Sequence, residues 1–529
     1  MKIRHIWACL ATICLLLVLM PPNHMAAASE WTTFKEAQQL EQQGKYKEAA
    51  LKYAQVAPIF VSKKEYGNAA QMYRRVGDCY VQLKQYDDAV LNWDQEASYA
   101  AKANQTQISL AATRKADQLR SSAKLYVETV STSGTPYNGT KLVPRNGALI
   151  GAYAELDSAV NDPKTGKSFT EQFPLMTGKK HAAYLLYFNY GNNPSILSKH
   201  LERAKASGTA IQLGIQPMNG LGEVKDDAYL RELAKALGDS DVPIFLRFAN
   251  EMNGDWVPWT GNPQLYIEKF RLVANVFREE AKNNVVMVWA PGEMPKYNMT
   301  DYYPGDAYVD WVGVSLYSIF NPAYDPLKLG EDRSSHLDKF DQIYKLYASR
   351  KPVFISEGAV SYMYPEQKQD KTGWAVYKTK EFYGSLPMVY PNVKGVFWFD
   401  SNKDSSQRMK YYMLSANPKL LDAYRTSIAS PFYLGSIGEE SPIAYKLINN
   451  QAIAADAYKL SAYVKTWAPI LSKITYTING QLAGSATAPP WTSSVNLTPY
   501  KGQTVKVIVQ AYDTTGKRVT TQSVPITVK

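Results

Sequence analysis

The sequence predicts a multidomain chain made of an α-helical repeat, a closed (β/α)8 barrel and a β-sandwich, in that order. Three patterns predict this fold class: an Ala/Tyr-rich helical repeat in residues 29–128, eight apolar runs separated by helical patterns in residues 147–430, and alternating apolar and polar residues in residues 431–529. A chain of 529 residues is too long for a single core. Each part is therefore expected to bury its own apolar side chains.

Residues 1–28 have the pattern of a secretory signal peptide. A basic start precedes an apolar run from Ile6 to Met20, and small residues suited to cleavage after Ala28 follow it. The run is short for a membrane span. We expect a secreted or extracellular chain, with the cell envelope as an alternative location and no transmembrane anchor in the mature protein. Cleavage leaves Cys79 as a single thiol, which cannot form an internal disulfide.

The charge pattern argues against nucleic acid as a partner. The formal net charge is +11, and it falls to +9 once the signal peptide takes away Lys2 and Arg4. The excess is spread along the chain without a dense Lys/Arg block, unlike a nucleic-acid-binding patch. Attraction to an acidic polymer or an anionic cell wall fits this charge. The histidines do not cluster as metal ligands, so neither a metal nor another cofactor is expected.

The helical part, residues 29–128, repeats a pattern of small Ala and large aromatic residues. On one helix face, this pairing allows two helices to cross closely while a ring fills the gap. The stretch "YRRVGDCYVQLKQYDDAVLNW" (Tyr73–Trp93) resembles a tetratricopeptide repeat, with Gly77 at the tight crossing. The resemblance implies a protein partner for the helical repeat, and a small helical bundle without a partner is the alternative.

Residues 129–146 are rich in Ser, Thr, Gly and Pro, which predicts a linker. Continuous apolar runs follow, and such runs suit parallel strands that are buried on both faces. The runs begin at Ala148, Ala182, Ala210, Val242, Val285, Val309, Pro352 and Val393. Their spacing of about 25 to 45 residues leaves room for a crossover helix in each unit. An open doubly wound sheet is the competing fold, but no Gly-rich phosphate loop follows the first run.

Residues 431–529 alternate apolar with polar residues between turn formers, which predicts a small antiparallel sandwich. The stretch that begins "YTINGQLAGSATAPPW" (residues 476–491) resembles bacterial immunoglobulin-like modules attached to secreted carbohydrate enzymes. The resemblance implies a spacer or a weak glycan contact. Trp467 and Trp491 either form an aromatic platform for glycan or lie in the core.

Two glutamates stand where barrel strands are expected to end. Glu251 follows the fourth apolar run, and Glu357 closes the seventh run. Because the carboxyl ends of parallel barrel strands meet at one mouth, both side chains can face the same ligand. Glycoside hydrolysis requires such a pair, since one carboxyl group donates a proton to the leaving oxygen and the other attacks the sugar or activates water.

The stretch "FLRFANEMNGDWVPWTG" (Phe245–Gly261) leads a set of motifs that resembles glycoside hydrolase family 26. The other motifs are "VWAP" (Val288–Pro291), "YVDWVGVSLY" (Tyr308–Tyr317) and "PVFISEGA" (Pro352–Ala359). This family contains β-mannanases and related endo-glycanases. The resemblance spans residues 147–404, and it is most specific around the first motif.

The resemblance implies a role for each of these site residues. Glu251 corresponds to the general acid/base and Glu357 to the nucleophile of a retaining double displacement. The family pattern also implies that Arg247 supports the site and that Tyr317 hydrogen-bonds the nucleophile. Trp256 and Trp259 are implied to line sugar subsites.

Three further residues are expected at the site. Trp398, at the end of the eighth run, is expected to form the floor of the reacting subsite. Mannanases of the family usually carry histidine immediately before the acid/base, where this chain has Asn250, and after the third strand, where it has Gln216. In related barrels an asparagine before the acid binds the sugar 2-hydroxyl. The departure therefore bears on mannan specificity rather than on catalysis.

These observations predict a secreted retaining endo-β-glycanase that hydrolyses β-linked polysaccharide by double displacement, with β-1,4-mannan as the default substrate. One alternative is a hydrolase of another β-glycan, such as mixed-linkage glucan, xylan or an exopolysaccharide made by the same cell. Another is a non-catalytic glycan-binding envelope protein whose barrel has lost turnover. Polysaccharide is the expected partner in each case.

Overall fold

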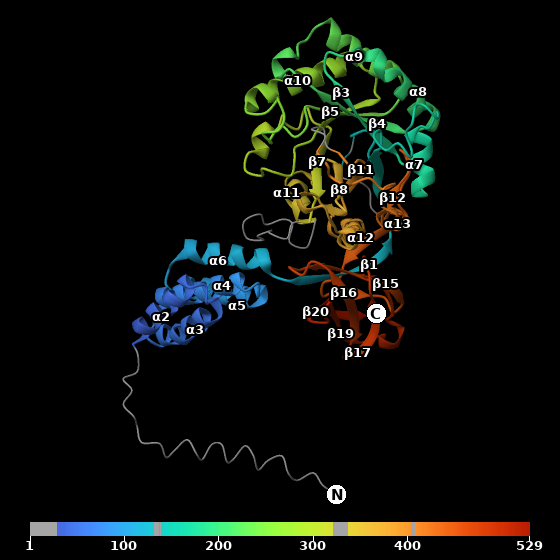
Figure 1. Ribbon diagram of the computed structural model, residues 1–529. Helices are drawn as coiled ribbons and strands as arrows, with labels where there is room; N and C mark the ends of the chain where they lie inside the picture. Colours follow the sequence, from blue (N-terminus) through green and yellow to red (C-terminus); the bar gives the residue numbers. More distant parts are fainter. Residues whose placement is uncertain (1–28, 132–136, 138, 321–336, 404–407) are drawn as a thin grey trace, which may run out of the picture. The chain divides into compact units, whose positions relative to one another are not determined.

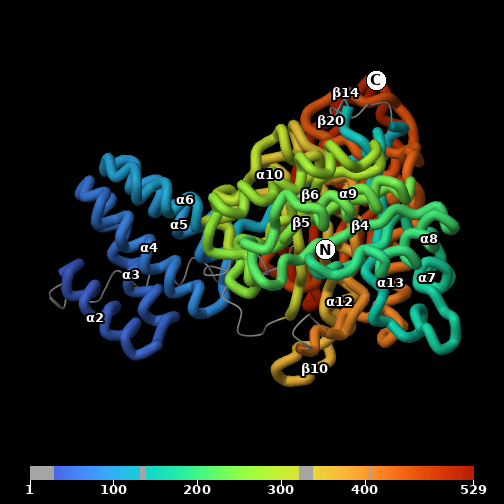
Figure 2. Tube along the Cα trace, turned by 90° about the horizontal axis from the view of Figure 1, so that it is seen from above, coloured from blue at the N-terminus to red at the C-terminus, as the bar shows by residue number. Residues whose placement is uncertain are grey.

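The computed structural model describes residues 29–131, 137, 139–320, 337–403 and 408–529. The predicted signal peptide therefore lies outside the described residues. The chain divides into two compact units, and the division falls between Arg120 and Ser121 (Figures 1 and 2). Within the described ranges, none of the helices has both the length and the apolar character needed to cross a bilayer.

The first unit is built from helices, as predicted. In its described residues, each helix packs against the next along the chain. These helices are α2 (Glu30–Gln42), α3 (Tyr46–Ser62), α4 (Tyr66–Gln82), α5 (Tyr86–Lys102) and α6 (Thr106–Leu119). A Cβ atom on Gly77 would stand 2.5 Å from the indole nitrogen of Trp93, so α4 and α5 approach as closely as the repeat pattern predicts. Membership of the tetratricopeptide class stays a prediction.

The second unit contains the predicted barrel (Figure 1). Its eight parallel strands are β2 (Ala148–Tyr153), β3 (Ala183–Asn189), β4 (Ala210–Gln216), β5 (Ile244–Phe248), β6 (Val285–Trp289), β7 (Trp311–Ser318), β8 (Val353–Val360) and β11 (Val393–Phe399). They follow one another in sequence order, and pairing between β11 and β2 closes the circle. The short strand β12 (Tyr433–Leu434) adds to β2, and a small hairpin joins β9 (Met363–Tyr364) to β10 (Gln369–Asp370).

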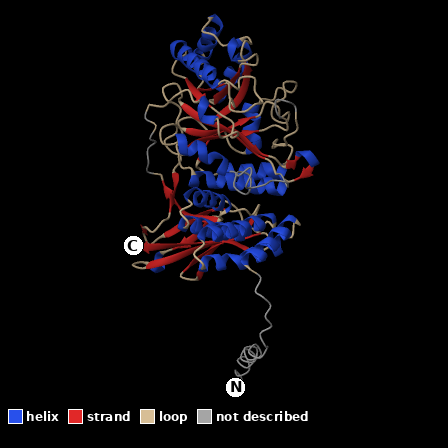
Figure 3. Ribbon diagram, turned by 90° about the vertical axis from the view of Figure 1, so that its left-hand side faces the viewer, coloured by secondary structure: helices blue, strands red, loops and turns tan. Residues whose placement is uncertain are grey.

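Helices surround the barrel strands (Figure 3). They are α7 (Phe169–Thr177), α8 (Ser198–Ser207), α9 (Ala228–Asp239), α10 (Pro263–Glu280), α11 (Leu337–Tyr347), α12 (Thr372–Val389) and α13 (Pro418–Ile428). In α9, Leu230, Leu233 and Leu237 are buried at helical spacing, and the Asp227 side chain caps the first turn. Between β6 and β7 the described crossover contains a short 3-10 helix, Met299–Tyr302, in place of an α-helix.

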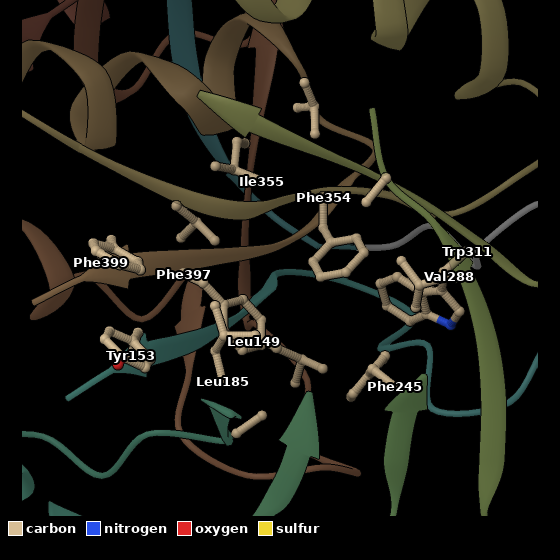
Figure 4. Packing of buried hydrophobic residues seen from close by; sticks show 14 of the residues in the cluster. Leu149, Tyr153, Leu185, Phe245, Val288, Trp311, Phe354, Ile355, Phe397 and Phe399 are labelled. Atoms are coloured by element: carbon tan, nitrogen blue, oxygen red, sulfur yellow. The ribbon is translucent and has the colours of Figure 1, made fainter. Parts of the chain in front are cut away.

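The inward faces of the strands fill the barrel with rings (Figure 4). Phe354 packs edge-on against Trp311 and Phe397, with ring centroids 5.3 and 5.8 Å apart. A Cβ atom on Gly151 would stand 2.3 Å from the Phe397 ring, so that ring occupies space that a larger residue on β2 would fill. The barrel interior is therefore a packed core, and ligands are left with the loops at its mouth.

Two further sheets complete the second unit. One has the order β13-β1-β15-β18 and the other the order β14-β20-β19-β16-β17. The strands are β1 (Ser122–Val130), β13 (Ile443–Leu447), β14 (Ala452–Ile453), β15 (Ala457–Lys465), β16 (Leu471–Ile478), β17 (Gln481–Ala486), β18 (Ser493–Asn496), β19 (Thr504–Asp513) and β20 (Arg518–Val528). Trp491 lies in the apolar core that these sheets share. An immunoglobulin-like class for this part stays a prediction.

One boundary of the sequence analysis is wrong in position. Residues 122–128 were assigned to the helical repeat, but they belong to β1, and the helices end at Leu119. β1 runs on to Val130, which is inside the predicted linker, and it pairs with β13 and β15. The alternation in "SAKLYVETV" is a strand signal, but the partners of this strand lie more than 300 residues further along the chain.

Candidate active site

A cleft of about 580 Å³ opens where the barrel strands end. Its lining comes from loops after several different strands, as expected for the mouth of a (β/α)8 barrel. Seven of the predicted site residues line it, and these are Gln216, Asn250, Glu251, Trp256, Trp259, Tyr317 and Glu357. The structure therefore brings the two glutamates together at one cleft.

Glu251 is held in an unusual backbone conformation in the turn that follows β5. Ala249 and Glu251 have φ angles of +46° and +59°, a left-handed region that costs energy for residues with a Cβ atom. The Glu251 N–H donates to the carbonyl of Ala290 at 2.8 Å, and the Ala249 N–H donates to the carbonyl of Ile215 at 2.9 Å. The neighbouring strands β4 and β6 thus hold the turn that aims Glu251 into the cleft.

The surroundings of Glu251 favour a protonated carboxyl group. Burial raises its pKa above the ordinary value, and the negative charge of Glu357 raises it further. Arg247 and hydrogen bonds from Ser315 and Trp256 act in the opposite direction but do not cancel the rise. A carboxyl group that keeps its proton at higher pH is suited to act as a general acid.

Glu357 reaches the cleft because β8 contains a bulge. Val314 of β7 pairs with Ile355, but the next residue, Ser315, pairs with Glu357, so Ser356 is an extra residue in β8. The carbonyl group of Ser356 accepts a hydrogen bond of 2.8 Å from the buried Gln212 side chain on β4. Gln212 thereby supplies a hydrogen bond to the carbonyl group of the bulge that turns Glu357 inward.

Both carboxylate oxygens of Glu357 receive hydrogen bonds. Arg247 Nη1 and the Tyr187 hydroxyl donate to one oxygen, and the Tyr317 hydroxyl donates to the other. Burial together with the charge of Glu357 raises the pKa of both tyrosines well above the usual range, so they keep their protons and remain donors. Three donors around one carboxylate suit a group that must attack while charged.

Arg247 connects the two glutamates. Its side chain is completely buried, and burial on its own lowers its pKa, but the charge of Glu357 and the hydrogen bond to it raise the pKa above the usual value. Its second terminal nitrogen, Nη2, donates to Ser315 Oγ at 2.6 Å, and Ser315 is hydrogen-bonded to Glu251. One guanidinium group thus fixes the positions of both carboxyl groups.

Trp256 forms an exposed indole surface beside Glu251. Its side chain is 53% exposed, and its Nε1–H donates to Glu251 Oε2 at 2.7 Å. A Cβ atom on Gly254 would stand 2.3 Å from the indole ring, so a larger residue there would displace the ring. The ring therefore rests on the backbone of its own loop, with one face available to a sugar.

Trp259 and Asn250 support each other at the edge of the cleft. Trp259 is 2% exposed, and its Nε1–H donates to the Asn250 carbonyl at 2.7 Å. Trp259 thus supports the backbone at Asn250, whereas Trp256 offers an exposed ring surface. The side-chain oxygen of Asn250 is buried and has no hydrogen-bond partner among the residues that the structure describes. A ligand hydroxyl at this point could supply the missing donor.

Trp398 does not line the cleft, so the prediction that it floors the reacting subsite is wrong. Its ring packs on Tyr424 of α13 at a centroid distance of 5.3 Å, and its Nε1–H donates to the carbonyl of Tyr412. Side chains alternate along a strand, and in β11 Phe397 and Phe399 take the inward positions. Phe399 lines the cleft instead.

Sequence reasoning missed Tyr187, Ser315 and Gln212, which hold the carboxyl groups in place. Their positions on the inward faces of strands were the available signal, since Tyr187 lies two residues after the inward Leu185 on β3. Without the strand register, none of these three differs from an ordinary core residue.

Two buried polar residues of the barrel, His181 and Asp400, have hydrogen-bond partners within it. His181 is buried, contacts Tyr424 through Nε2 at 2.8 Å, and has a pKa lowered to about 3 by burial. Asp400 is buried and accepts a hydrogen bond of 2.6 Å from the Leu414 N–H. Among the described residues, no group of three or more His, Cys, Asp or Glu side chains is arranged to hold a metal ion.

The model of glycosyl hydrolase family 26 matches residues 225–386 of this chain. Endoglucanase H of Acetivibrio thermocellus is 26% identical over 279 residues, which cover 50% of this chain and 29% of that protein. A β-1,3-xylanase of Alcaligenes sp is 27% identical over 233 residues, which cover 41% of this chain and 45% of that protein. Each alignment therefore spans less than half of the relative's length.

The comparisons also give matches to mannanases. Mannan endo-1,4-β-mannosidase of Bacillus subtilis is 30% identical over 111 residues, which cover 18% of this chain and 30% of that protein. Among solved structures, the chain is similar to a GH26 β-mannanase from Bacteroides ovatus, with a TM-score of 0.41 and 15% identity over 56% of this chain and 92% of that chain. The family match lies inside the barrel, and it includes both Glu251 and Glu357. Residues 225–386, in the second unit, are thus similar to glycosyl hydrolase family 26.

Proposed function

We propose that the chain is a secreted retaining endo-β-glycanase. Glu251 acts as the general acid and then the general base, and Glu357 acts as the nucleophile. Support comes from the contrast between the two carboxyl groups. The pKa of Glu251 is raised, so this group holds its proton to higher pH, whereas Glu357 is surrounded by hydrogen-bond donors. This contrast between two carboxyl groups at one cleft is the observation that carries the proposal.

In the first step, Glu357 attacks the anomeric carbon and Glu251 gives its proton to the departing glycosidic oxygen. In the second step, Glu251 takes a proton from water, which attacks the same carbon and releases Glu357. Arg247 stays bonded to both halves of the site through Glu357 and Ser315. Its charge balances Glu357 before attack, and Ser315 supports Glu251 once Glu251 becomes ionised.

The substrate proposal is a β-linked polysaccharide, with β-1,4-mannan as the default. Relatives of the barrel are named endoglucanase, β-1,3-xylanase and mannan endo-1,4-β-mannosidase. In the cleft, the Trp256 ring offers a surface on which a pyranose ring can stack, and the unpartnered Asn250 oxygen offers an acceptor for a sugar hydroxyl. Gln216 extends the polar lining on the β4 side.

The mechanism is tested with Glu357→Gln, Glu251→Ala and the full chain on a panel of mannan, mixed-linkage glucan, β-1,3-xylan and β-1,4-xylan. We expect Glu357→Gln to lose at least about a thousandfold in kcat/KM, because a neutral amide cannot attack. On an aryl β-glycoside, whose leaving group departs without a proton, azide should restore turnover to Glu251→Ala and yield a β-glycosyl azide, because azide needs no base.

The matched control is Glu232→Gln, which changes an exposed glutamate of α9 outside the cleft and should leave activity unchanged. An initial product of inverted configuration, followed by nuclear magnetic resonance, would contradict the double displacement. Failure of the unaltered chain to hydrolyse any polymer that it binds would favour the glycan-binding alternative.

A further inference from the structure

A buried amide behind the cleft wall joins two of the loops that carry the site. Asn253 lies between β5 and α10, and its side chain is 2% exposed. It is not among the residues that line the cleft, and neither step of the proposed mechanism involves it. Its backbone is held as well, because the Asn298 side chain donates to the Asn253 carbonyl at 3.0 Å.

The Asn253 amide binds one residue of the loop after β6 from both sides. Its Nδ2 donates to the Gly292 carbonyl at 3.0 Å, and its Oδ1 accepts from the Gly292 N–H at 2.8 Å. Nδ2 also donates to the Pro295 carbonyl at 3.0 Å. Both amide hydrogens and the amide oxygen are therefore used to fix the backbone of this loop.

The same loop is fixed to β7 on its other side. The Ser315 N–H donates to the Pro291 carbonyl, and the Glu293 N–H donates to the Ser315 carbonyl, both at 3.1 Å. Gly292 itself forms an isolated bridge with Ser315. Gly292 is thus held between β7 on one side and the Asn253 amide on the other.

Gly292 supports the exposed indole of the cleft. A Cβ atom on Gly292 would stand 3.3 Å from the six-membered ring of Trp256, and a Cβ atom on Gly254 would stand 2.3 Å from it. The indole therefore rests on two glycines. One belongs to its own loop, and the other belongs to the loop that Asn253 holds.

The position of the indole determines its bond to the acid. Trp256 Nε1–H donates to Glu251 Oε2 at 2.7 Å. A hydrogen bond weakens as its length grows and as its angle departs from linear, so a tilt of the ring weakens this one. Asn253, Gly292, Trp256 and Glu251 thus form a continuous series of contacts that begins outside the cleft and ends at the proposed acid.

We infer that Asn253 is a positioning residue, which fixes Gly292 and thereby holds the Trp256 ring where it bonds Glu251 and presents its free face to a sugar. This inference rests on the proposed hydrolase function and adds a residue that acts through Trp256. The Asn253 amide touches no reacting atom, so its effect reaches the reaction only through the ring.

Other titratable groups also surround Glu251, and the variants below leave them unchanged. Burial raises the Glu251 pKa most, the charge of Glu357 adds to this rise, and Arg247 lowers the pKa. The groups around Glu251 are Glu357, Arg247, Tyr187 and Tyr317, and Glu293 of the same cleft with its partner Lys339. A pKa change that follows Asn253 alone is therefore assigned to the indole.

The first test is Asn253→Ala in the full chain, with the polymer of the panel that the unaltered chain hydrolyses fastest. A displaced indole stabilises ionised Glu251 less, so the basic limb of the kcat/KM profile should move up by about 0.5 pH unit. The maximum of kcat/KM should fall about tenfold, because the acid and the stacking surface are both displaced. Asn253→Ser keeps one hydroxyl donor, so it should fold more readily and move the limb less in the same direction.

A double-mutant cycle asks whether the effect passes through the ring. Asn253→Ala/Trp256→Phe should have the same basic limb as Trp256→Phe alone, because the amide has no indole left to position. The matched control is Asn284→Ala. Asn284 Nδ2 donates to the carbonyls of Leu237 and Val242 at 3.0 and 2.9 Å, at the opposite end of β6. Its loss should lower the melting temperature and leave the limb unchanged.

A second readout does not depend on turnover. The indole N–H signal of Trp256 in nuclear magnetic resonance is identified by its loss in Trp256→Phe, and in the unaltered chain it should titrate with Glu251. In Asn253→Ala this signal should be displaced and its response to pH should shrink. In Asn284→Ala it should stay in place.

The outcomes separate this inference from the proposed function. Additive shifts of the limb in the double variant, or an indole signal that Asn253→Ala leaves in place, would overturn the positioning role and leave the hydrolase proposal standing. Absence of hydrolysis by the unaltered chain, with the indole signal displaced in Asn253→Ala and not in Asn284→Ala, would overturn the hydrolase proposal and keep the link from Asn253 to Trp256.

Discussion

The two ends of the barrel interior are built in opposite ways from the same strands. On β5, the inward Phe245 packs against the rings of Trp311 and Phe354, and two residues later the inward Arg247 joins a network of charged and hydroxyl groups. Burial of apolar rings at one end stabilises the folded state, whereas the polar groups at the other end lose their hydration and the backbone there is strained. The difference teaches that a rigid apolar layer supports a site that could not stabilise itself.

The largest expected effect is at the polar end. Arg247→Met should abolish hydrolysis and lower the free energy of unfolding by about 3 to 5 kcal/mol, because Glu357 is left as a buried charge without its cation. Urea unfolding and kcat/KM measure the two effects. The double variant Arg247→Met/Glu357→Gln should regain part of the stability without activity. Equal instability of the single and double variants would show that lost packing, rather than lost charge pairing, is responsible.

At the apolar end, Phe354→Ala should lower the free energy of unfolding by about 3 kcal/mol, because a cavity opens among Trp311, Phe245 and Phe397. The residue contacts no substrate, so the folded fraction should keep a KM close to that of the unaltered chain. Thermal unfolding and KM at a temperature below the transition test both statements. A large change in KM with unchanged stability would contradict the assignment of stability to the apolar end and of substrate binding to the polar end.

Gln212 stands between the two ends and should show a mixed effect. Gln212→Met removes the donor to the Ser356 carbonyl, so the free energy of unfolding should fall by about 1 to 2 kcal/mol. Because the bulge then loosens and Glu357 shifts, kcat should fall about tenfold with little change in KM. Leu213→Met, on the other face of β4, is the matched control. A fall in kcat that is equal in both variants would count against positioning through the bulge.

The smallest expected effect concerns pH dependence. The indole N–H of Trp256 stabilises ionised Glu251, so Trp256→Phe should raise the Glu251 pKa. The acid form then persists to higher pH, and the basic limb of the kcat/KM profile should move up by roughly 0.5 to 1 pH unit, where one unit corresponds to about 1.4 kcal/mol. Gly254→Ala displaces the same ring and should reproduce the shift. If the basic limb of the kcat/KM profile is unchanged in both variants, the Trp256 indole does not set the pKa of Glu251.

The sequence predicts the barrel and its two glutamates because both depend on local patterns. Eight continuous apolar runs mark the strands; Glu251 lies in the turn after β5, and Glu357 lies within β8. The direction of a side chain depends on register, and a single bulge changes it. Ser356 adds one residue to β8 and turns Glu357 inward, whereas in β11, Trp398 points away from the cleft.

Long-range pairing explains the other differences. β1 has an alternating pattern, but its partners lie after the barrel, so composition alone placed residues 122–128 with the helices that precede them. Tyr187 and Ser315 belong to different strands, and their shared role emerges only when the barrel closes. Contacts between side chains on different strands of the closed barrel cannot be predicted from the pattern of any one segment.

The pairing of β1 also has a consequence for biosynthesis. Ser121 and Thr466, which are hydrogen-bonded beside this sheet, are 345 positions apart in the chain. Synthesis proceeds from the N-terminus, so β1 leaves the ribosome long before the strands on either side of it exist. Both edges of this strand therefore lack their partners until the last hundred residues have been made.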